Sequence, residues 1–589
     1  MAIRRRLPLL FVLTVFVLLA WSRHSREQTR RDAPSGRVVT LRIPPIAAPR
    51  MTPALQRATH VPPPAQTHAS APAASALPAT TASVPATTAA PASAAATAQR
   101  GHNGRPLTPI DMPMAQSWPV VNQWSDTMER EYDDFVAGLG RAVSQHRCRA
   151  IDDCLRNPEA NTLYDARTDA AFDLHVDCAD LPYVLRAYFS FKRRLPFGFV
   201  AAIRGDAGRD PRYTLNIRPD GFRNWQQFQS PRALLRDIGS MVHSGMYRMA
   251  PPIEDSDFYQ AAVSRRAIHP GTIFYDPNGH VLVVTEVRAD GQIYLMDGHP
   301  DGTLTYKRFG EAFVTGTARL GGGFKNFRPV RWQNGRITRA ANADLPMFDA
   351  SAQFDHSGYQ VEGSASGYHA WVRASVRDGS VRVDPIDDFR EQVRALCRDV
   401  SDRVDAVNIS TAANIYSQTH PDGLPENIYG TDGDWETYST PSRDARLKAS
   451  FRELFESVQQ RTDRVALAPA LEAAWHEEVA RPECQFQYAR TDGTVAHLSL
   501  DTVLDRIYKI SFDPYQCVEL RWGAVPGSDE ASTCHDDTVR MRWYFDEQRL
   551  RNRIDREYGV PTPLSSGPSA GSDIDVRRLI RHLIAGQTT

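Results

Sequence analysis

Cys178 and His280 have the types and positions that nucleophilic catalysis requires. Cys178 stands in Asp177-Cys178-Ala179-Asp180-Leu181, at the expected amino terminus of a helix. Free backbone N–H groups and the positive dipole end at such a position favour thiolate over thiol. His280 opens an expected strand after the Pro277-Asn278-Gly279 turn, and its imidazole can take the thiol proton. We therefore predict a cysteine nucleophile with a histidine base.

A histidine base needs a third group that orients its ring. Asp297 closes the strand that follows the one His280 opens, and adjacent antiparallel strands bring such end positions side by side. His299 is the alternative third member. The competing interpretation makes Cys178 a buried structural thiol and His280 a turn residue. The predicted catalytic residues are Cys178, His280, Asp297 and His299.

Hydrophobic spacing predicts the elements that carry these residues. Apolar residues recur at helical spacing from Leu181 to Phe189, so we expect a helix that begins between Cys178 and Asp180 and ends before Pro196. Three β-branched and aromatic runs separated by turns, at 272–275, 281–287 and 292–296, predict an antiparallel meander. A further helix is expected over 231–243. The inserted stretch that contains it and Trp225 should line or cover the cleft.

The seven cysteines are an odd number, so one thiol is unpaired unless it bridges two chains. Cys148 and Cys154 are close enough to form one loop, as are Cys517 and Cys534, which would leave Cys397 and Cys484 for each other. Six cysteines permit 15 pairings, and the sequence does not decide among them. Because Cys178 stands at the expected start of a helix, we predict that it is the unpaired cysteine.

The amino-terminal part has the pattern of an exported chain. Arg4, Arg5 and Arg6 precede the apolar run 7–21, so residues 1–31 are predicted to be a signal peptide or an uncleaved membrane anchor. Residues 32–104 are rich in Pro, Ala and Thr and predict a disordered linker. The expected location is periplasmic or extracellular, with anchoring in the inner membrane if the segment is uncleaved.

Two local motifs resemble those of a known enzyme group. Asp177-Cys178-Ala179-Asp180-Leu181 resembles the nucleophile motif of NlpC/P60 hydrolases, and Pro270-Gly271-Thr272-Ile273 with Gly279-His280-Val281 is similar to the pattern shared by NlpC/P60 and CHAP amidases. The resemblance covers residues 165–305. It implies a papain-like domain, a helix with cysteine packed on an antiparallel sheet with histidine, over residues 105–335. The residue order also resembles transglutaminase-like hydrolases.

Residues 336–589 are predicted to form a second, mainly helical domain with a short β-rich start at 350–385. Amphipathic spacing predicts helices over 389–404, 442–479 and 537–558. His369-Ala370-Trp371-Val372 is expected to be an ordinary strand. The aromatic and polar loop 427–443 either binds a ligand or only connects helices. The whole chain is therefore assigned to the α+β class.

Composition excludes some partners. The 69 basic and 69 acidic side chains balance, which argues against nucleic-acid binding. His497 and His535 have no Cys or His at ligand spacing, and Gly321-Gly322-Gly323 lacks the Lys of a phosphate loop. We expect neither a metal nor a cofactor.

These patterns together predict an exported cysteine hydrolase that cleaves an amide bond through a thioester. The resemblance to NlpC/P60 cell-wall hydrolases implies peptidoglycan peptide as the favoured substrate. One alternative is a non-catalytic envelope protein that uses the same fold for binding. Another is a transglutaminase-like amide transferase. The pattern leaves open the bond that is cut, the oligomeric state and the role of the carboxy-terminal domain.

Overall fold

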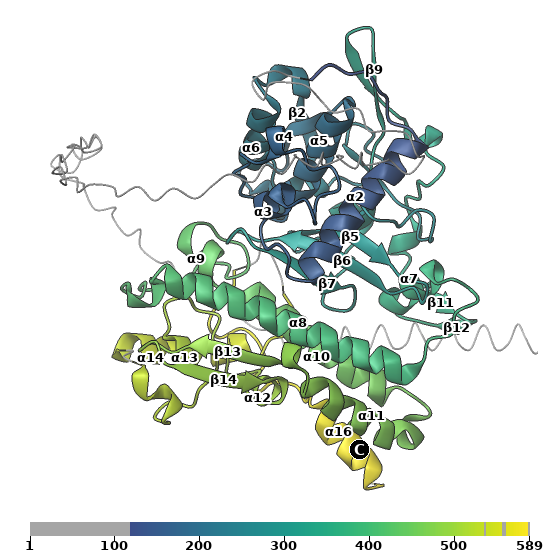
Figure 1. Ribbon diagram of the computed structural model, residues 1–589. Coiled ribbons are helices and arrows are strands. Elements are labelled where there is room, and N and C mark those ends of the chain that lie inside the picture. The colour runs from purple at the N-terminus through teal and green to yellow at the C-terminus, as the bar shows by residue number, and fades with distance from the viewer. Residues whose placement is uncertain (1–117, 535–536, 557–560, 587–589) are drawn as a thin grey trace, which may run out of the picture. The chain divides into compact units, whose positions relative to one another are not determined.

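The computed structural model describes residues 118–534, 537–556 and 561–586, all within one compact unit. Helices and strands are mixed along this unit (Figure 1), which confirms the α+β class at the coarse level. The predicted signal or anchor at 1–31 and the linker at 32–104 lie outside the described residues. Within the described ranges, no helix has both the length and the apolar character to span a membrane.

A six-stranded antiparallel sheet with strand order β3-β8-β4-β5-β6-β7 forms the centre of the unit. Its members β4, β5 and β6 coincide with the three predicted strands, so the meander is confirmed, and Asp276 of β4 pairs with His280 of β5. The six strands are β3 (Phe258–Gln260), β4 (Ile273–Asp276), β5 (His280–Val287), β6 (Ile293–Gly298), β7 (Leu304–Arg308) and β8 (Gly323–Phe327).

Both faces of this sheet are buried, and each belongs to a different hydrophobic core. Along β4, Ile273 and Tyr275 point into one core, whereas Phe274 points into the other. Along β6 the same alternation separates Met296 from Leu295. Side chains alternate between the two faces of a strand, so continuous apolar runs give a sheet covered on both sides.

Residues 118–306 supply the core on the first face. The long helix α2 crosses this face over β5 (Figure 1), and α5 packs beside it. The elements before the sheet are α2 (Asp126–Ser144), α3 (Ile151–Arg156), α4 (Ala166–Asp169), α5 (Asp180–Arg193), β1 (Gly198–Arg204), β2 (Arg218–Asn224) and α6 (Pro231–Met241). The predicted helices at 178–196 and 231–243 are confirmed as α5 and α6.

The carboxy-terminal helices cover the second face. The longest of them, α8, lies along β7 and contacts α10 and α11 on its other side (Figure 1). The helices are α7 (Tyr368–Val376), α8 (Pro385–Ala412), α9 (Gly433–Tyr438), α10 (Pro441–Gln459), α11 (Arg464–Val479), α12 (Leu500–Asp505), α13 (Val518–Arg521), α14 (Thr538–Asp546), α15 (Gln548–Arg551) and α16 (Val576–Ile584). Three two-stranded hairpins complete the described residues: β9 (Val330–Gln333) with β10 (Arg336–Arg339), β11 (Gln360–Val361) with β12 (Ser364–Ala365), and β13 (Gln485–Ala489) with β14 (Val495–Ser499).

The sequence-based assignment of this half needs several corrections. The predicted β-rich start at 350–385 contains only the two-residue strands β11 and β12 beside helix α7. The predicted strand at His369-Ala370-Trp371-Val372 is wrong, because these residues belong to helix α7. Tyr368, Val372 and Val376 are four residues apart and are all buried in the second core, so the helical period decides the structure. The predicted helix over 442–479 is two helices, α10 and α11, and the one predicted over 537–558 is also two, α14 and α15, the second of which ends at Arg551.

The disulfides follow the favoured pairing. Three bridges join Cys148 to Cys154, Cys397 to Cys484 and Cys517 to Cys534. Among the described residues Cys178 is the free thiol. Disulfides persist in oxidising compartments, which agrees with a location outside the cytoplasm.

Candidate active site

Asp177 fixes the backbone on which Cys178 stands. Its Oδ1 accepts hydrogen bonds from the backbone N–H groups of Ala179 at 2.8 Å and of Asp180 at 3.0 Å. The side chain of Asp177 thus satisfies two backbone donors at the start of α5. On the other side, a Cβ on Gly298 would lie 2.7 Å from the Asp177 carbonyl oxygen. The glycine therefore lets the cysteine segment approach the end of β6 closely.

The Cys178 sulfur lies against the first residues of β5. Its distance to the Gly279 carbonyl oxygen is 3.9 Å, and the Val281 backbone N–H is within hydrogen-bonding reach of it. Gly279 has a φ of +92°, which the tight turn between β4 and β5 requires. The sulfur thus contacts the residues on both sides of His280.

Asp297 holds His280 through a short hydrogen bond. His280 Nε2 is 2.6 Å from Asp297 Oδ2, and Asp297 is fully buried. The same carboxylate accepts the Thr305 hydroxyl through Oδ1 and lies 3.4 Å from His299 Nε2. His299 is also 3.2 Å from Thr305 Oγ1. Asp297 therefore sits between the two histidines, and His299 contacts the carboxylate rather than replacing it.

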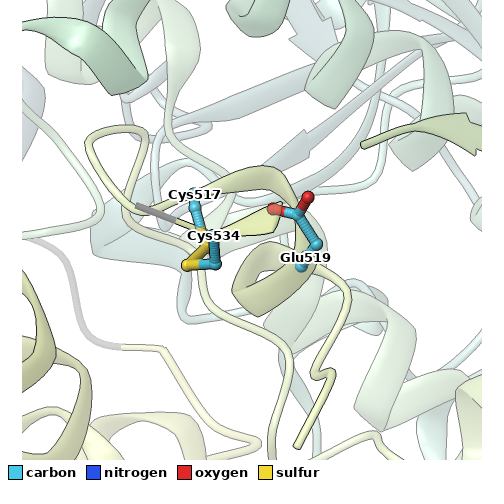
Figure 2. A group of neighbouring side chains, drawn as sticks. All are labelled: Cys517, Glu519 and Cys534. Atoms are coloured by element: carbon cyan, nitrogen blue, oxygen red, sulfur yellow. A yellow bond between two sulfur atoms is a disulfide. The ribbon is translucent and has the colours of Figure 1, made fainter. Parts of the chain in front are cut away.

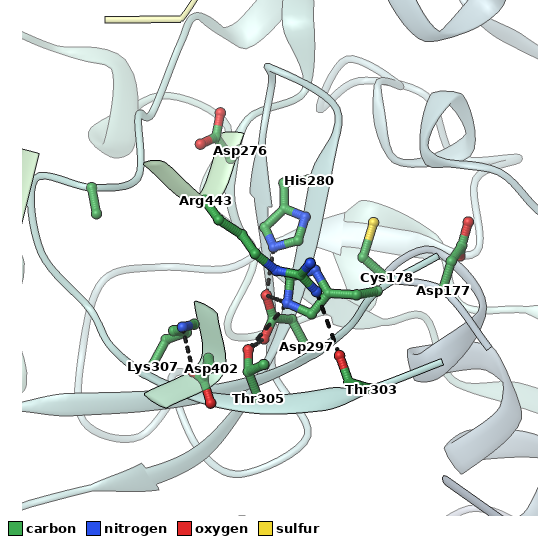
Figure 3. Close-up of polar contacts among 12 residues, drawn as sticks. Asp177, Cys178, Asp276, His280, Asp297, Thr303, Thr305, Lys307, Asp402 and Arg443 are labelled. Atoms are coloured by element: carbon green, nitrogen blue, oxygen red, sulfur yellow. Dashed lines mark hydrogen bonds and ion pairs between the residues drawn. The ribbon is translucent and has the colours of Figure 1, made fainter. Parts of the chain in front are cut away.

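Figure 3 shows how Cys178, His280 and Asp297 face one another. The His280 ring turns one nitrogen to Asp297, and its other nitrogen is on the side of Cys178. When Nε2–H donates to the carboxylate, Nδ1 keeps a lone pair that can accept a proton. The structure thus brings the predicted Cys178, His280, Asp297 and His299 together at one place.

The protonation of Cys178 differs from the sequence-based expectation of a thiolate. Burial, together with the charges of Asp177, Asp297 and Asp180, raises the pKa of the Cys178 thiol well above its usual value. The helix start does not reverse this, because α5 begins at Asp180 and Asp177 already occupies its first N–H groups. The resting nucleophile is a thiol.

The histidines are neutral in the resting site. Burial and the nearby positive charge of Arg446 lower the pKa of His280, although Asp297 opposes them. Burial and Arg443 lower the pKa of His299 as well. Burial works against ionisation of Asp297, but His299 and the hydrogen bond from His280 hold its pKa below the usual value. A neutral thiol, a neutral imidazole and a carboxylate therefore face one another.

Cys178, His280 and His299 line an open cleft of about 160 Å³. Two other parts of the chain complete it. The insertion between α5 and the sheet contributes Arg212, Tyr213, His243 and Ser244, and the carboxy-terminal half contributes residues within 428–446. The aromatic loop 427–443, which includes α9, is therefore a wall of the cleft and not only a connection.

Charged side chains of both signs surround the catalytic residues in this cleft. Glu436 of α9 is 3.9 Å from Arg212, and burial with the charge of Asp177 raises the pKa of Glu436 to about 7. Arg443 donates to Asp301 at 2.7 Å, and Arg446 lies next to it along the lining. Sequence reasoning missed these residues, and its one signal for them was the unusual composition of 427–443.

Trp225, which the sequence places in the inserted stretch, is not among the residues that line the cleft. Trp225 is buried and donates to the Trp118 carbonyl oxygen, so it supports the inserted stretch from inside.

A group of possible metal ligands lies apart from the cleft, at Cys517, Glu519 and Cys534 (Figure 2). The two cysteines form a disulfide and offer no thiolate. Glu519 accepts hydrogen bonds from Thr491 instead. These three residues therefore offer no available ligand set for a metal ion.

The chain matches no family model, no curated protein and no solved structure.

Proposed function

We propose that this protein is a cysteine hydrolase that cleaves an amide bond through a thioester. One observation carries the proposal. The free thiol of Cys178 lies against residues 279–281 in an open cleft, and His280 is held there by a 2.6 Å hydrogen bond to buried Asp297. A nucleophile, a base and a group that orients the base are the parts that this chemistry needs.

The resting protonation states define the first step. Cys178 is a thiol and His280 is neutral, so sulfur attacks the substrate carbonyl carbon while its proton passes to His280 Nδ1. Asp297 stabilises the imidazolium that forms. His280 then gives the proton to the leaving amine, and the acyl group stays on sulfur as a thioester. Water activated by His280 hydrolyses the thioester and restores the thiol.

Peptidoglycan peptide is the substrate class that we propose. The support is the resemblance of the Cys178 and His280 segments to NlpC/P60 and CHAP amidases. That resemblance also implies a papain-like arrangement of helix and sheet, which we propose for residues 105–335. Acidic and basic groups in the cleft, such as Glu436 and Arg212, suit a polar peptide with charges of both signs. The three disulfides support action outside the cytoplasm.

Digestion of purified cell-wall peptide tests the proposal. The wild-type protein should release new amino groups, and Cys178→Ala should release none while its circular dichroism and melting temperature stay unchanged. Activity that survives in Cys178→Ala would refute the mechanism. No release by the folded wild-type protein from any amide substrate would instead favour a non-catalytic binding role. Added amines that are incorporated into product would indicate a transferase.

A further inference from the structure

A second polar cluster, His420, Asp513 and Glu547, lies in the carboxy-terminal half. Each offers one ligand atom, and these atoms all lie within 4.8 Å of one another. All three residues are buried, with exposed fractions of 5%, 0% and 0%. The residues come from three separate places in the chain: the segment after the short helical turn at Ile415–Ser417, the loop before α13 and the junction of α14 with α15.

Glu547 has no partner that satisfies its carboxylate. Neither of its oxygens accepts a hydrogen bond from the described residues, although both are inaccessible to solvent. The nearest cation is Arg551, whose Nη1 is 3.9 Å from Oε2 and itself makes no hydrogen bond to a described residue. An unpaired buried carboxylate is costly, so this geometry calls for a further positive group at the cluster.

His420 has the arrangement of a metal-binding histidine. Its Nδ1 is 2.7 Å from the Pro421 carbonyl oxygen, and only a ring N–H can make that contact. Histidines that bind metals commonly donate their other nitrogen to a backbone carbonyl in this way. The other nitrogen, Nε2, is 2.7 Å from Asp513 Oδ2, a separation that a proton on Nε2 accounts for when no metal is bound. A metal ion would replace that proton and bind both atoms, which would then lie slightly farther apart.

The structure assigns His420, Asp513 and Glu547 as a binding site for a divalent first-row metal ion, with Zn²⁺ as the preferred ion. One imidazole nitrogen and two carboxylate oxygens are ligands that Zn²⁺ accepts. The sequence predicted no metal because these residues are far apart, with 93 positions between His420 and Asp513 alone.

The site would hold the wall of the cleft in place. Trp543 stacks on His420 and Tyr515 packs at its edge. Tyr515 belongs to a small core that also contains Ile428 and Tyr429, both of which line the cleft. A metal bound next to this core would link the segment at His420, which precedes the cleft wall in the chain, to the loop at Asp513. The metal would thus be structural, because none of its three ligands lines the cleft.

The competing explanation needs no metal. Burial and the charge of Asp513 raise the pKa of Glu547 well above its usual value. Without a cation, Glu547 would therefore be protonated and could share its proton with Asp513, while His420 would carry a positive charge. Glutamine resembles a protonated glutamate in shape and in its ability to donate, so Glu547→Gln separates the two explanations.

Metal content of the full-length protein is the test. After incubation with Zn²⁺ and gel filtration, elemental analysis should find about one Zn²⁺ per chain at this site, and EDTA should lower the melting temperature until Zn²⁺ is restored. Glu547→Gln should lose that equivalent and weaken Zn²⁺ affinity by roughly 100-fold or more. Glu519→Gln, which changes another buried glutamate, and Cys178→Ala should keep the metal.

Two results would overturn the assignment. The first is wild-type protein that binds neither Zn²⁺ nor Mn²⁺ and melts at the same temperature with and without EDTA. The second is Glu547→Gln with unchanged metal content and stability, which would assign a shared proton to the cluster. If Glu547→Gln does not fold, the metal content of the wild-type protein and its visible absorption after Co²⁺ is added still test whether the site binds a metal. Because Cys178→Ala leaves these three residues unchanged, the result of the metal-binding test does not depend on whether the hydrolase proposal is correct.

Discussion

Replacing Asp297 with asparagine tests the catalytic arrangement most directly. In the wild-type protein the carboxylate accepts Nε2–H of His280 at 2.6 Å, which leaves Nδ1 free to accept the thiol proton. The asparagine amide can donate to Nε2 instead, and the ring proton then moves to Nδ1. In that tautomer His280 cannot take the proton from Cys178.

The size of the effect follows from the lost interactions. A hydrogen bond to a charged group contributes about 1.5–3 kcal/mol, so its loss in the transition state slows the reaction by roughly 10- to 150-fold. The wrong tautomer adds to this, and in related triads the total loss is roughly 10⁴-fold. We therefore expect kcat/KM of Asp297→Asn to fall by between roughly 10²- and 10⁴-fold.

The assay is amine release from cell-wall peptide, with circular dichroism to confirm the fold. Lys307 lies near Asp297 and pairs with Asp402 at 2.6 Å. Asp402→Asn is therefore the matched control, because it changes another carboxylate beside the same lysine. Lys307 keeps its 2.8 Å contact with Asp399 in that variant. We expect the control to retain activity. If Asp297→Asn is folded and within threefold of the wild-type protein, roughly 0.7 kcal/mol, Asp297 does not orient the base.

Three further predictions concern protonation and stability. Burial and Arg446 lower the pKa of His280, so the base stays neutral in mild acid. We therefore expect kcat/KM to fall only below about pH 6.5. A pH profile in which kcat/KM is already half-maximal above pH 7 would contradict this. Because burial raises the pKa of Cys178, iodoacetamide should label it more slowly at pH 7 than a free thiol, and faster labelling would indicate a standing thiolate. Cys397 and Cys484 are buried and 87 residues apart, so changing both to alanine should lower the free energy of unfolding by about 4.5 kcal/mol in urea titration; a loss below about 1 kcal/mol would show that the bridge is not needed.

Local patterns in the sequence predicted the elements that carry the candidate site. The helical spacing after Cys178 located α5, and alternating β-branched residues located β5 and β6 with His280 and Asp297 at their ends. The observed disulfide pairing is the one that the short loops suggested, although the sequence left other pairings open. These features depend on neighbours in the chain, which a sequence displays directly.

The surroundings of the site could not be predicted in the same way. The pKa of the Cys178 thiol depends first on burial and then on the charge of neighbouring Asp177, with a smaller effect of Asp297. Burial is set by residues far from Cys178 in the sequence. The cleft wall at 428–446 comes from the other half of the chain, and no local pattern indicates where that segment packs. The helical face of Tyr368, Val372 and Val376 was missed because the short apolar run around His369 also fits a strand. The boundary between the two domains at residues 335 and 336 stays a prediction.

The central sheet limits how this protein can be shortened for study. A fragment ending near residue 335 would keep Cys178, His280 and Asp297, yet it would expose Phe274, Leu295 and the other apolar side chains that α8 and its neighbours cover. It would also lose the ion pairs that join Arg308 to Glu453 and Asp276 to Arg556. Such a fragment would aggregate through its bare sheet, so its inactivity would say nothing about the chemistry of the cysteine.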